Sequence, residues 1–227
     1  MKKIKTLFSF FFVLVGVFML TTACDPISDT PDQLTDDVHN IIPPDILVKF
    51  KNLGIEINGG KTPPNIEGTY NFSPCILVKS NFSDGFSPGT KFADMKLTFS
   101  KQDNAKLTVV CDYIQAVEIG SGLGSFITGT GRKFSVYAEI LGTYQNKPFK
   151  SVIIFSGEIA EGGIKNLQEA LLVTVEAPGT IKRGEGRLFK DGDGFSERML
   201  ETRIQNLRGT SSKELKSMGV TTTQQAY

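Results

Sequence analysis

Residues 105–119, AKLTVVCDYIQAVEI, decide the fold class, because apolar and polar side chains alternate along them. The odd positions are mostly apolar: Leu107, Val109, Cys111, Tyr113, Gln115, Val117 and Ile119. The even positions include Lys106, Thr108, Asp112 and Glu118. A period of two residues is typical of a β-strand with one face in a core. The stretch therefore predicts a long strand whose odd positions point inward.

The same alternation recurs along the chain and predicts an all-β fold. Further strands are expected at residues 92–100, 133–141, 148–159 and 170–176, among others. Segments rich in Gly, Asn, Asp or Pro predict turns between strands, at 83–89, 101–104, 120–124, 129–133, 144–147 and 177–186. About eight strands with short sequential connections favour an antiparallel up-and-down barrel, and a β-sandwich is the alternative.

Two helices are expected to flank the strands. Residues 43–54, PPDILVKFKNLG, begin with proline, place apolar residues on one side and stop at Gly54, which predicts a short amino-terminal helix. After Phe195, Leu200, Ile204 and Leu207 have helical spacing and predict a carboxyl-terminal helix. The predicted barrel domain thus covers residues 45–207, and residues 208–227 are expected to be a flexible tail.

The amino terminus has the form of a secretory signal. The basic start MKKIK precedes an apolar run, and the small residues TTA precede Cys24. The run has about 15 apolar residues, whereas about 20 are needed for a helix across a bilayer. Residues 1–23 are therefore predicted to be a cleaved signal peptide.

Residues 21–24, TTAC, resemble the lipobox of bacterial lipoprotein precursors, although Leu20 stands one place earlier than the usual leucine. The resemblance implies that Cys24 is acylated and holds the protein on a membrane of the bacterial envelope. The outer membrane, on its periplasmic or surface face, is the expected location. Residues 24–44 are acidic and contain proline, which predicts a flexible tether after the lipidated cysteine.

Charge gives no indication of a nucleic-acid partner. The formal net charge is +1, and no basic stripe follows a helix or strand. Removal of residues 1–23 leaves 22 basic against 24 acidic side chains, and residues 25–44 contain five aspartates and no lysine or arginine.

No catalytic constellation is apparent, and neither an enzyme activity nor a cofactor is expected. His39, the sole histidine, falls in the predicted tether, where it has no nucleophile beside it. Cys75 and Cys111 lack the paired spacing of a zinc site. They are either partners in one disulfide or two small buried apolar side chains.

Carboxylates provide one weak metal candidate. Asp191, Asp193 and Glu197 alternate with glycines in DGDGFSE in the manner of a calcium loop, although a tight turn explains the same residues. Acids within the predicted strands, such as Glu118 and Glu139, are expected mostly on the solvated face.

Residues 66–70, IEGTY, resemble the first strand of lipocalin and calycin barrels, in which Gly, any residue and an aromatic follow a short helix. Gly68, Thr69 and Tyr70 occupy these positions, with Tyr in place of the usual Trp. Together with the lipobox, the tether, the helix and DGDG near the end, the segment resembles lipocalin-like lipoproteins of bacterial envelopes. A barrel of about eight strands is just wide enough for one small ligand, so we expect it to bind a small apolar or amphipathic molecule. The expected lining residues are Tyr70, Met95, Phe99, Tyr113 and Phe155. The alternative is a non-catalytic accessory subunit with a barrel filled by its own side chains.

Overall fold

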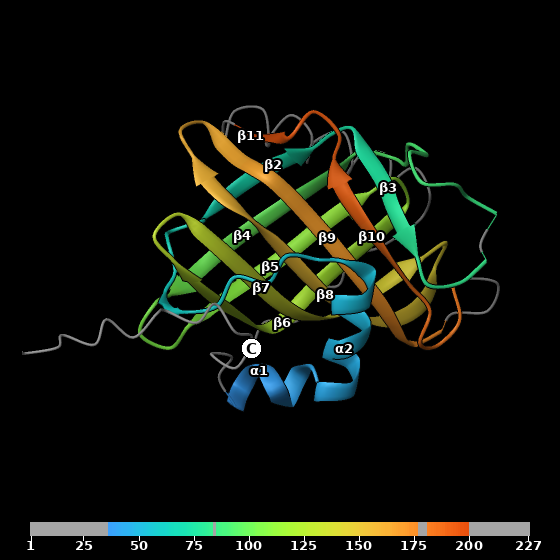
Figure 1. Cartoon of the computed structure of the whole chain (residues 1–227), viewed down its shortest axis with the longest axis horizontal. Coiled ribbons are helices and arrows are strands. Elements are labelled where there is room, and N and C mark those ends of the chain that lie inside the picture. Colours follow the sequence, from blue (N-terminus) through green and yellow to red (C-terminus); the bar gives the residue numbers. More distant parts are fainter. Residues whose placement is uncertain (1–35, 84, 177–180, 200–227) are drawn as a thin grey trace, which may run out of the picture.

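The computed structural model describes residues 36–83, 85–176 and 181–199. These residues form mostly β-structure, with two short helices, α1 (Asp36–Ile41) and α2 (Pro44–Leu53). The strands of the described chain are β1 (Lys61–Thr62), β2 (Gly68–Phe72), β3 (Cys75–Ser80), β4 (Met95–Asp103), β5 (Thr108–Gln115), β6 (Glu118–Thr130), β7 (Lys133–Tyr144), β8 (Lys147–Ala160), β9 (Gly163–Val175), β10 (Gly186–Asp191) and β11 (Phe195–Arg198). The predicted all-β class is confirmed (Figure 1).

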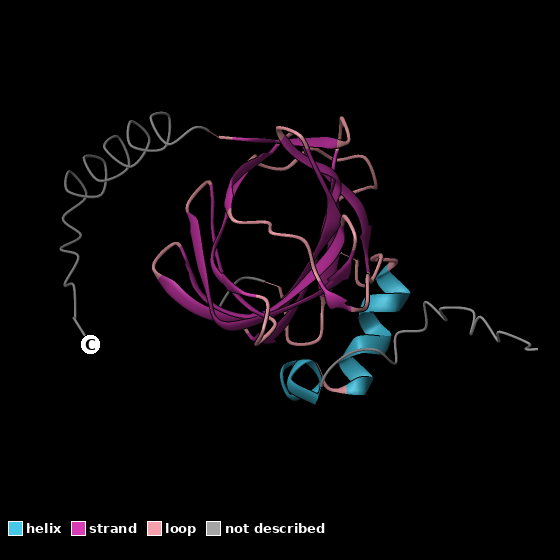
Figure 2. Ribbon diagram, turned by 90° about the vertical axis from the view of Figure 1, so that its left-hand side faces the viewer, coloured by secondary structure: helices cyan, strands magenta, loops and turns pink. Residues whose placement is uncertain are grey.

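Eight of the strands form a closed ring. From β4 to β9 each strand pairs antiparallel with the next along the chain, and β2 pairs with β4. Strand β11 closes the ring by pairing with both β9 and β2, because Glu197 lies opposite Gly163 of β9 and Asn71 of β2. Figure 2 shows this ring from one end, with both helices outside it. Strands β10 and β3 continue the sheet from β9, and β1 adds a short parallel pairing with β6.

The apolar core has two parts. The interior cluster lies within the ring and includes Tyr70, Phe99, Phe134, Phe155 and Leu167. The outer cluster lies between the helices and the outer face of the ring, and its members include Leu47, Phe50, Tyr137, Ile154 and Ala170. Residues 152–155 of β8 alternate between the two clusters, and residues 170–172 of β9 do the same, so both faces of these parts of the strands are buried.

The predicted amino-terminal helix is confirmed as α2. Pro44 occupies its first position, and Gly54 ends it with a φ of 101°, donating its N–H to the carbonyl oxygens of Phe50 and Lys51. Leu47, Phe50 and Leu53 form its buried face.

The prediction of a flexible tether over residues 24–44 is wrong at its carboxyl end. Residues 36–41 form α1, and Val38 and Ile42 are completely buried in the outer cluster. The apolar side chains in this acidic segment pack on the ring, which stabilises a helix too short to persist in isolation. The predicted signal peptide, Cys24 and the rest of the tether lie outside the described residues.

The turn predicted at residues 120–124 is wrong, and so is the single strand predicted through 105–119. The chain turns at Ala116 and Val117, and β6 runs through the glycines. Odd-numbered residues point inward before this turn, and even-numbered residues point inward directly after it. Ile119 is therefore 44% exposed, whereas Glu118 takes the inward-facing position. A two-residue hairpin usually carries Gly or Asn; here Ala116 itself adopts a φ of 50°.

The carboxyl-terminal helix predicted after Phe195 is wrong for its first residues, since Phe195–Arg198 form β11. Leu200, Ile204, Leu207 and the predicted tail lie outside the described residues. Within the described chain, neither helix has the length and apolar character needed to cross a membrane.

Candidate ligand site inside the ring

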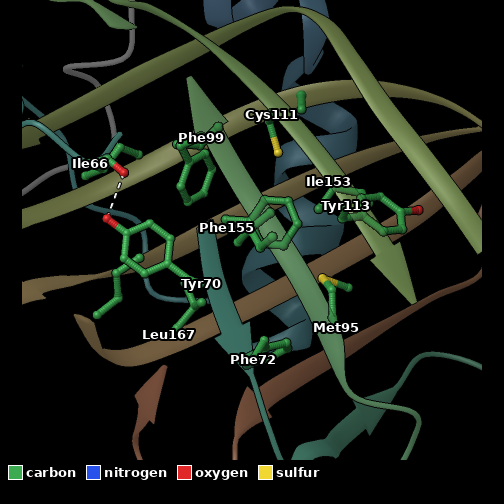
Figure 3. Close-up of a cluster of buried hydrophobic side chains, with 14 of the residues drawn as sticks. Ile66, Tyr70, Phe72, Met95, Phe99, Cys111, Tyr113, Ile153, Phe155 and Leu167 are labelled. Carbon is green, nitrogen blue, oxygen red and sulfur yellow. Dashed lines mark hydrogen bonds between the residues drawn. The ribbon is translucent and has the colours of Figure 1, made fainter. Parts of the chain in front are cut away.

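The five residues predicted to line a ligand site come together in the interior cluster. Each is at most 2% exposed, and they come from β2, β4, β5 and β8: Tyr70, Met95, Phe99, Tyr113 and Phe155. Figure 3 shows their side chains converging within the ring. The alternation of the strands was sufficient to select them, because each occupies an inward position.

Aromatic rings fill one part of this interior. The Phe99 ring centroid lies 6.2 Å from that of Tyr70, 6.1 Å from that of Phe134 and 6.0 Å from that of Phe155, with tilted or edge-to-face geometry. The Tyr70 hydroxyl donates to the Ile66 carbonyl oxygen at 2.9 Å (Figure 3), and burial raises the pKa of Tyr70. This part of the interior is a packed aromatic core.

A buried carboxyl group, Glu169, lies beside the aromatic rings. Leu167 belongs to the interior cluster and Ala170 to the outer one, so the alternation of β9 directs Glu169 inward. It is 2% exposed, pairs across the sheet with Phe155 and Phe189, and its Oε2 has no hydrogen-bond partner among the described residues. Burial, reinforced by the negative charge of Glu118, raises the pKa of Glu169 to about 8.

Sequence reasoning missed Glu169 because the strand was expected to begin at Ala170. The alternation of Leu171 and Val173 in fact extends back before Ala170, to Glu169 and Leu167. A carboxylate in an inward position of such a strand was therefore the signal that could have found it.

A second carboxyl group, Glu118, hydrogen-bonds to the predicted lining residue Tyr113. The tyrosine hydroxyl donates to Glu118 Oε1, and burial raises the pKa of both groups. The Tyr113 ring lies against Gly120, where a Cβ atom would be 2.2 Å from Cε1 of the ring. The expectation of a solvated Glu118 is therefore wrong, because the hairpin at 116–117 turns it inward.

A hydroxyl group, that of Ser151, is also buried in the ring without a partner. Ile153 and Phe155 point into the ring and Val152 points outward, so Ser151 of the same strand points inward. It is 2% exposed, and no described residue bonds its Oγ. The interior therefore contains two polar side chains, Glu169 and Ser151, each with an unpartnered oxygen.

An arginine surrounded by aromatic rings lies two residues along β10 from Phe189, the cross-strand partner of Glu169. Arg187 of β10 pairs with Leu171, and its guanidinium lies 5.2–5.4 Å from the ring centroids of Phe82, Phe86 and Phe92. Its positive charge lowers the pKa of Glu118, opposing the larger effect of burial.

Cys75 and Cys111 are free thiols, so the first of the two alternatives, a disulfide between them, is not formed. Both are fully buried in the interior cluster, which matches the alternative of small apolar side chains. Burial raises the pKa of each thiol, so neither is activated as a nucleophile.

The weak calcium candidate forms a turn instead of a donor cluster. Asp191 Oδ2 accepts a hydrogen bond from Ser196 Oγ at 2.5 Å, and Asp193 Oδ1 accepts one from the Phe195 N–H at 2.9 Å. Glu197 lies further along β11. Among the described residues, no three His, Cys, Asp or Glu side chains gather as metal ligands.

His39 lies on α1, outside the ring, and not in a flexible segment. Its Nδ1 is buried without a hydrogen-bond partner in the described chain. Cys24 lies outside the described residues, so its acylation stays a prediction.

Comparisons of the chain with protein-family models, with curated proteins and with solved structures find no match.

Proposed function

We propose that this protein is a lipid-anchored lipoprotein of the bacterial envelope whose ring is a lipocalin-like barrel that binds a small amphipathic ligand. The observation that carries the binding function is the pair of unpartnered polar side chains, Glu169 and Ser151, buried beside the aromatic cluster.

Buried polar groups in folded proteins nearly always have a hydrogen-bond partner, and leaving one without a partner costs roughly 1–3 kcal/mol. A ligand that supplies the missing partners would remove this cost. Ligand sites typically combine apolar and aromatic walls with a few polar groups. The interior of the ring has this composition, with Phe155 beside Glu169 and Ile153 between Ser151 and Phe155.

The barrel assignment draws support from the strand order and from the start of β2. Sequential antiparallel pairing from β4 to β9 with closure through β11 is the connectivity of an up-and-down barrel. Gly68, Thr69 and Tyr70 begin β2 after the short helix α2, as in the lipocalin pattern. Gly68 has a φ of 151°, a backbone conformation that favours glycine, and a Cβ atom there would lie 2.8 Å from Nε of the Arg198 side chain.

The membrane anchor is tested by following a labelled fatty acid. Cells grown with the label should yield a labelled full-length protein, because the lipobox-like TTAC segment directs acylation to Cys24. A Cys24→Ala variant should carry no label, whereas Cys75→Ala, which changes a buried thiol, should remain labelled. Label on the Cys24→Ala variant would contradict the anchor.

The binding function is tested by purifying the full chain from its own cells and measuring its mass under native conditions. We expect a small molecule to co-purify at up to one equivalent and to be released by organic solvent. If none is found, and if a fluorescent apolar probe also fails to bind the purified protein, the binding function is wrong.

The second candidate, an accessory subunit without a ligand, rests on a different observation. Several large apolar side chains near the hairpin at 116–117 are exposed, by 43–61%: Ile114, Val117, Ile119 and Leu141. Ile114 and Ile119 are cross-strand partners. Such a group suits a protein contact, and charged substitutions of Ile114 and Ile119 together should release a partner that co-purifies.

A further inference from the structure

We infer that the ligand carries a protonated amine, which forms an ion pair with Glu169 inside the ring while the apolar part of the ligand packs against the aromatic cluster. This inference rests on the proposed binding function and specifies the chemical class of the ligand.

The position of Glu169 is the first support. Its side chain points inward, is 2% exposed and has an unpartnered oxygen. The cross-strand partners on either side are Phe155 and Phe189. Water is therefore largely excluded from the carboxyl group, and a partner inside the ring would interact with it strongly.

The charges around Glu169 are the second support. The titratable groups that interact with it are Glu118 on β6, Tyr113 and Cys111 on β5, and Cys75 on β3. All of these are neutral or negative. The neighbouring inward residues of β8, Ile153 and Ser151, do not titrate.

In the described chain, the two cationic side chains of β10, Arg187 and Lys190, do not pair with Glu169. Arg187 pairs across the sheet with Leu171, and its guanidinium lies over three phenylalanine rings. Lys190 is exposed. Among the described residues, none forms a salt bridge with Glu169.

An ammonium group would complement this environment. It would offset the cost of an ionised carboxylate at Glu169, and it would also be attracted by Glu118 and by the faces of nearby phenylalanine rings. A fatty acid would instead bring its carboxylate next to the negative charge of Glu118, and Glu169 would have to stay protonated beside it. The charges therefore select an amine over an acid of the same chain length.

Binding of the amine should release a proton. The pKa of Glu169 is about 8, so this carboxyl group is mostly protonated at pH 7 before the ligand binds. To form the ion pair the carboxyl group loses its proton to the solvent, while the amine keeps its own. Affinity should therefore rise about tenfold per pH unit between pH 6 and pH 7.5, and level off above pH 8.

The test is calorimetric titration of the purified full chain, kept in a nonionic detergent, with octylamine, octanoate and octanol. Titration of each compound into the detergent solution without protein is the blank. We expect octylamine to bind, with close to one proton released at pH 7 as measured in buffers of different ionisation enthalpy. Octanoate should not bind. Glu169→Gln should abolish proton release and weaken octylamine binding at least tenfold at pH 8, whereas Glu161→Gln, an exposed carboxylate, should change neither.

Each alternative result has a defined meaning. Octanoate or octanol binding as tightly as octylamine, or an affinity that falls as pH rises, would overturn the amine assignment while supporting an apolar ligand. Failure of all three compounds to bind would overturn the proposed binding function itself. A melting curve of Glu169→Gln at pH 5 checks that the variant is folded. Glu118→Gln removes the second negative charge near the site, and it should weaken octylamine binding to a smaller degree than Glu169→Gln does.

Discussion

At the scale of single residues, Glu169 occupies a position that the alternation of β9 otherwise gives to apolar side chains. Its neighbours of the same parity, Leu167 and Leu171, pack in or against the interior cluster. Burial of its carboxyl group opposes ionisation. Protonation of Glu169 is therefore coupled to folding.

This coupling predicts a pH-dependent stability. Folding raises the pKa of Glu169 from 4.5 to about 8, so the folded state binds more protons than the unfolded state between these values. The free energy of unfolding should accordingly decrease as pH rises from 5 to 8, by about 5 kcal/mol at most at 1.36 kcal/mol per pKa unit. Urea denaturation of ligand-free protein at pH 5 and pH 8 measures the change, and Glu169→Gln should remove most of it. Parallel pH profiles of the two proteins would contradict the prediction.

A second residue-scale prediction concerns Gly120. Alanine there would place its Cβ atom 2.2 Å from Cε1 and 2.4 Å from Cζ of Tyr113, which is too close for non-bonded atoms. The tyrosine would have to move and would lose its hydrogen bond to Glu118. Gly120→Ala should lower the free energy of unfolding by about 1–3 kcal/mol. The loss should be smaller when the same change is made in a Tyr113→Ala background, and equal losses in both backgrounds would show that the ring does not cause it.

At the scale of elements, local signals predicted α2 and most strands but misplaced the turn between β5 and β6. The helix was predictable because Pro44, Gly54 and the apolar face all act within one segment. The turn was missed because Ala116 and Val117 are not turn formers, whereas the glycines of 120–124 are. Those glycines lie in β6, and two of them, Gly120 and Gly122, leave no room for a side chain beside Tyr113 and Ser125.

Helix α2 provides a matched pair of substitutions. Phe50 is fully buried in the outer cluster, whereas Val48 on the same helix is 54% exposed. Phe50→Ala should cost about 3–5 kcal/mol of stability, because the deletion leaves a cavity against the ring. Val48→Ala should change it by less than about 0.5 kcal/mol. Thermal unfolding followed by circular dichroism compares the two, and similar effects would mean that α2 does not pack as described.

At the scale of the whole molecule, β11 closes the ring. It joins β9 to β2, and the buried Ser196 hydroxyl donates to the Asp191 carboxylate. The two strands that β11 connects are distant in sequence and make few contacts with each other directly. The short segment 195–198 therefore holds β2 and β9 together and closes the ring.

Truncation tests this closure. A chain ending at Gly194 should lose protection from hydrogen exchange at the amides of β2 and of residues 163–165, because their partners on β11 are gone. A chain ending at Met199 retains β11 and serves as the control, with protection expected to match that of the full chain. Equal protection in both truncated chains would show that the ring does not depend on β11.

The amino-acid sequence was enough to establish the all-β class, the helix α2 and the inward placement of Tyr70, Met95, Phe99, Tyr113 and Phe155. These features follow from a period of two or from end signals within one segment, and both are local. Closure by β11, the packing of α1 and the meeting of Glu118, Tyr113 and Glu169 depended on the tertiary structure. Strand alternation separates the two faces of a sheet, but it does not reveal which strands pair or where a turn without glycine changes the parity. Pairing between distant segments settled which strands close the ring, and the pairing of Gln115 with Glu118 across the hairpin settled where the turn lies. Together they define the site where we place the ligand.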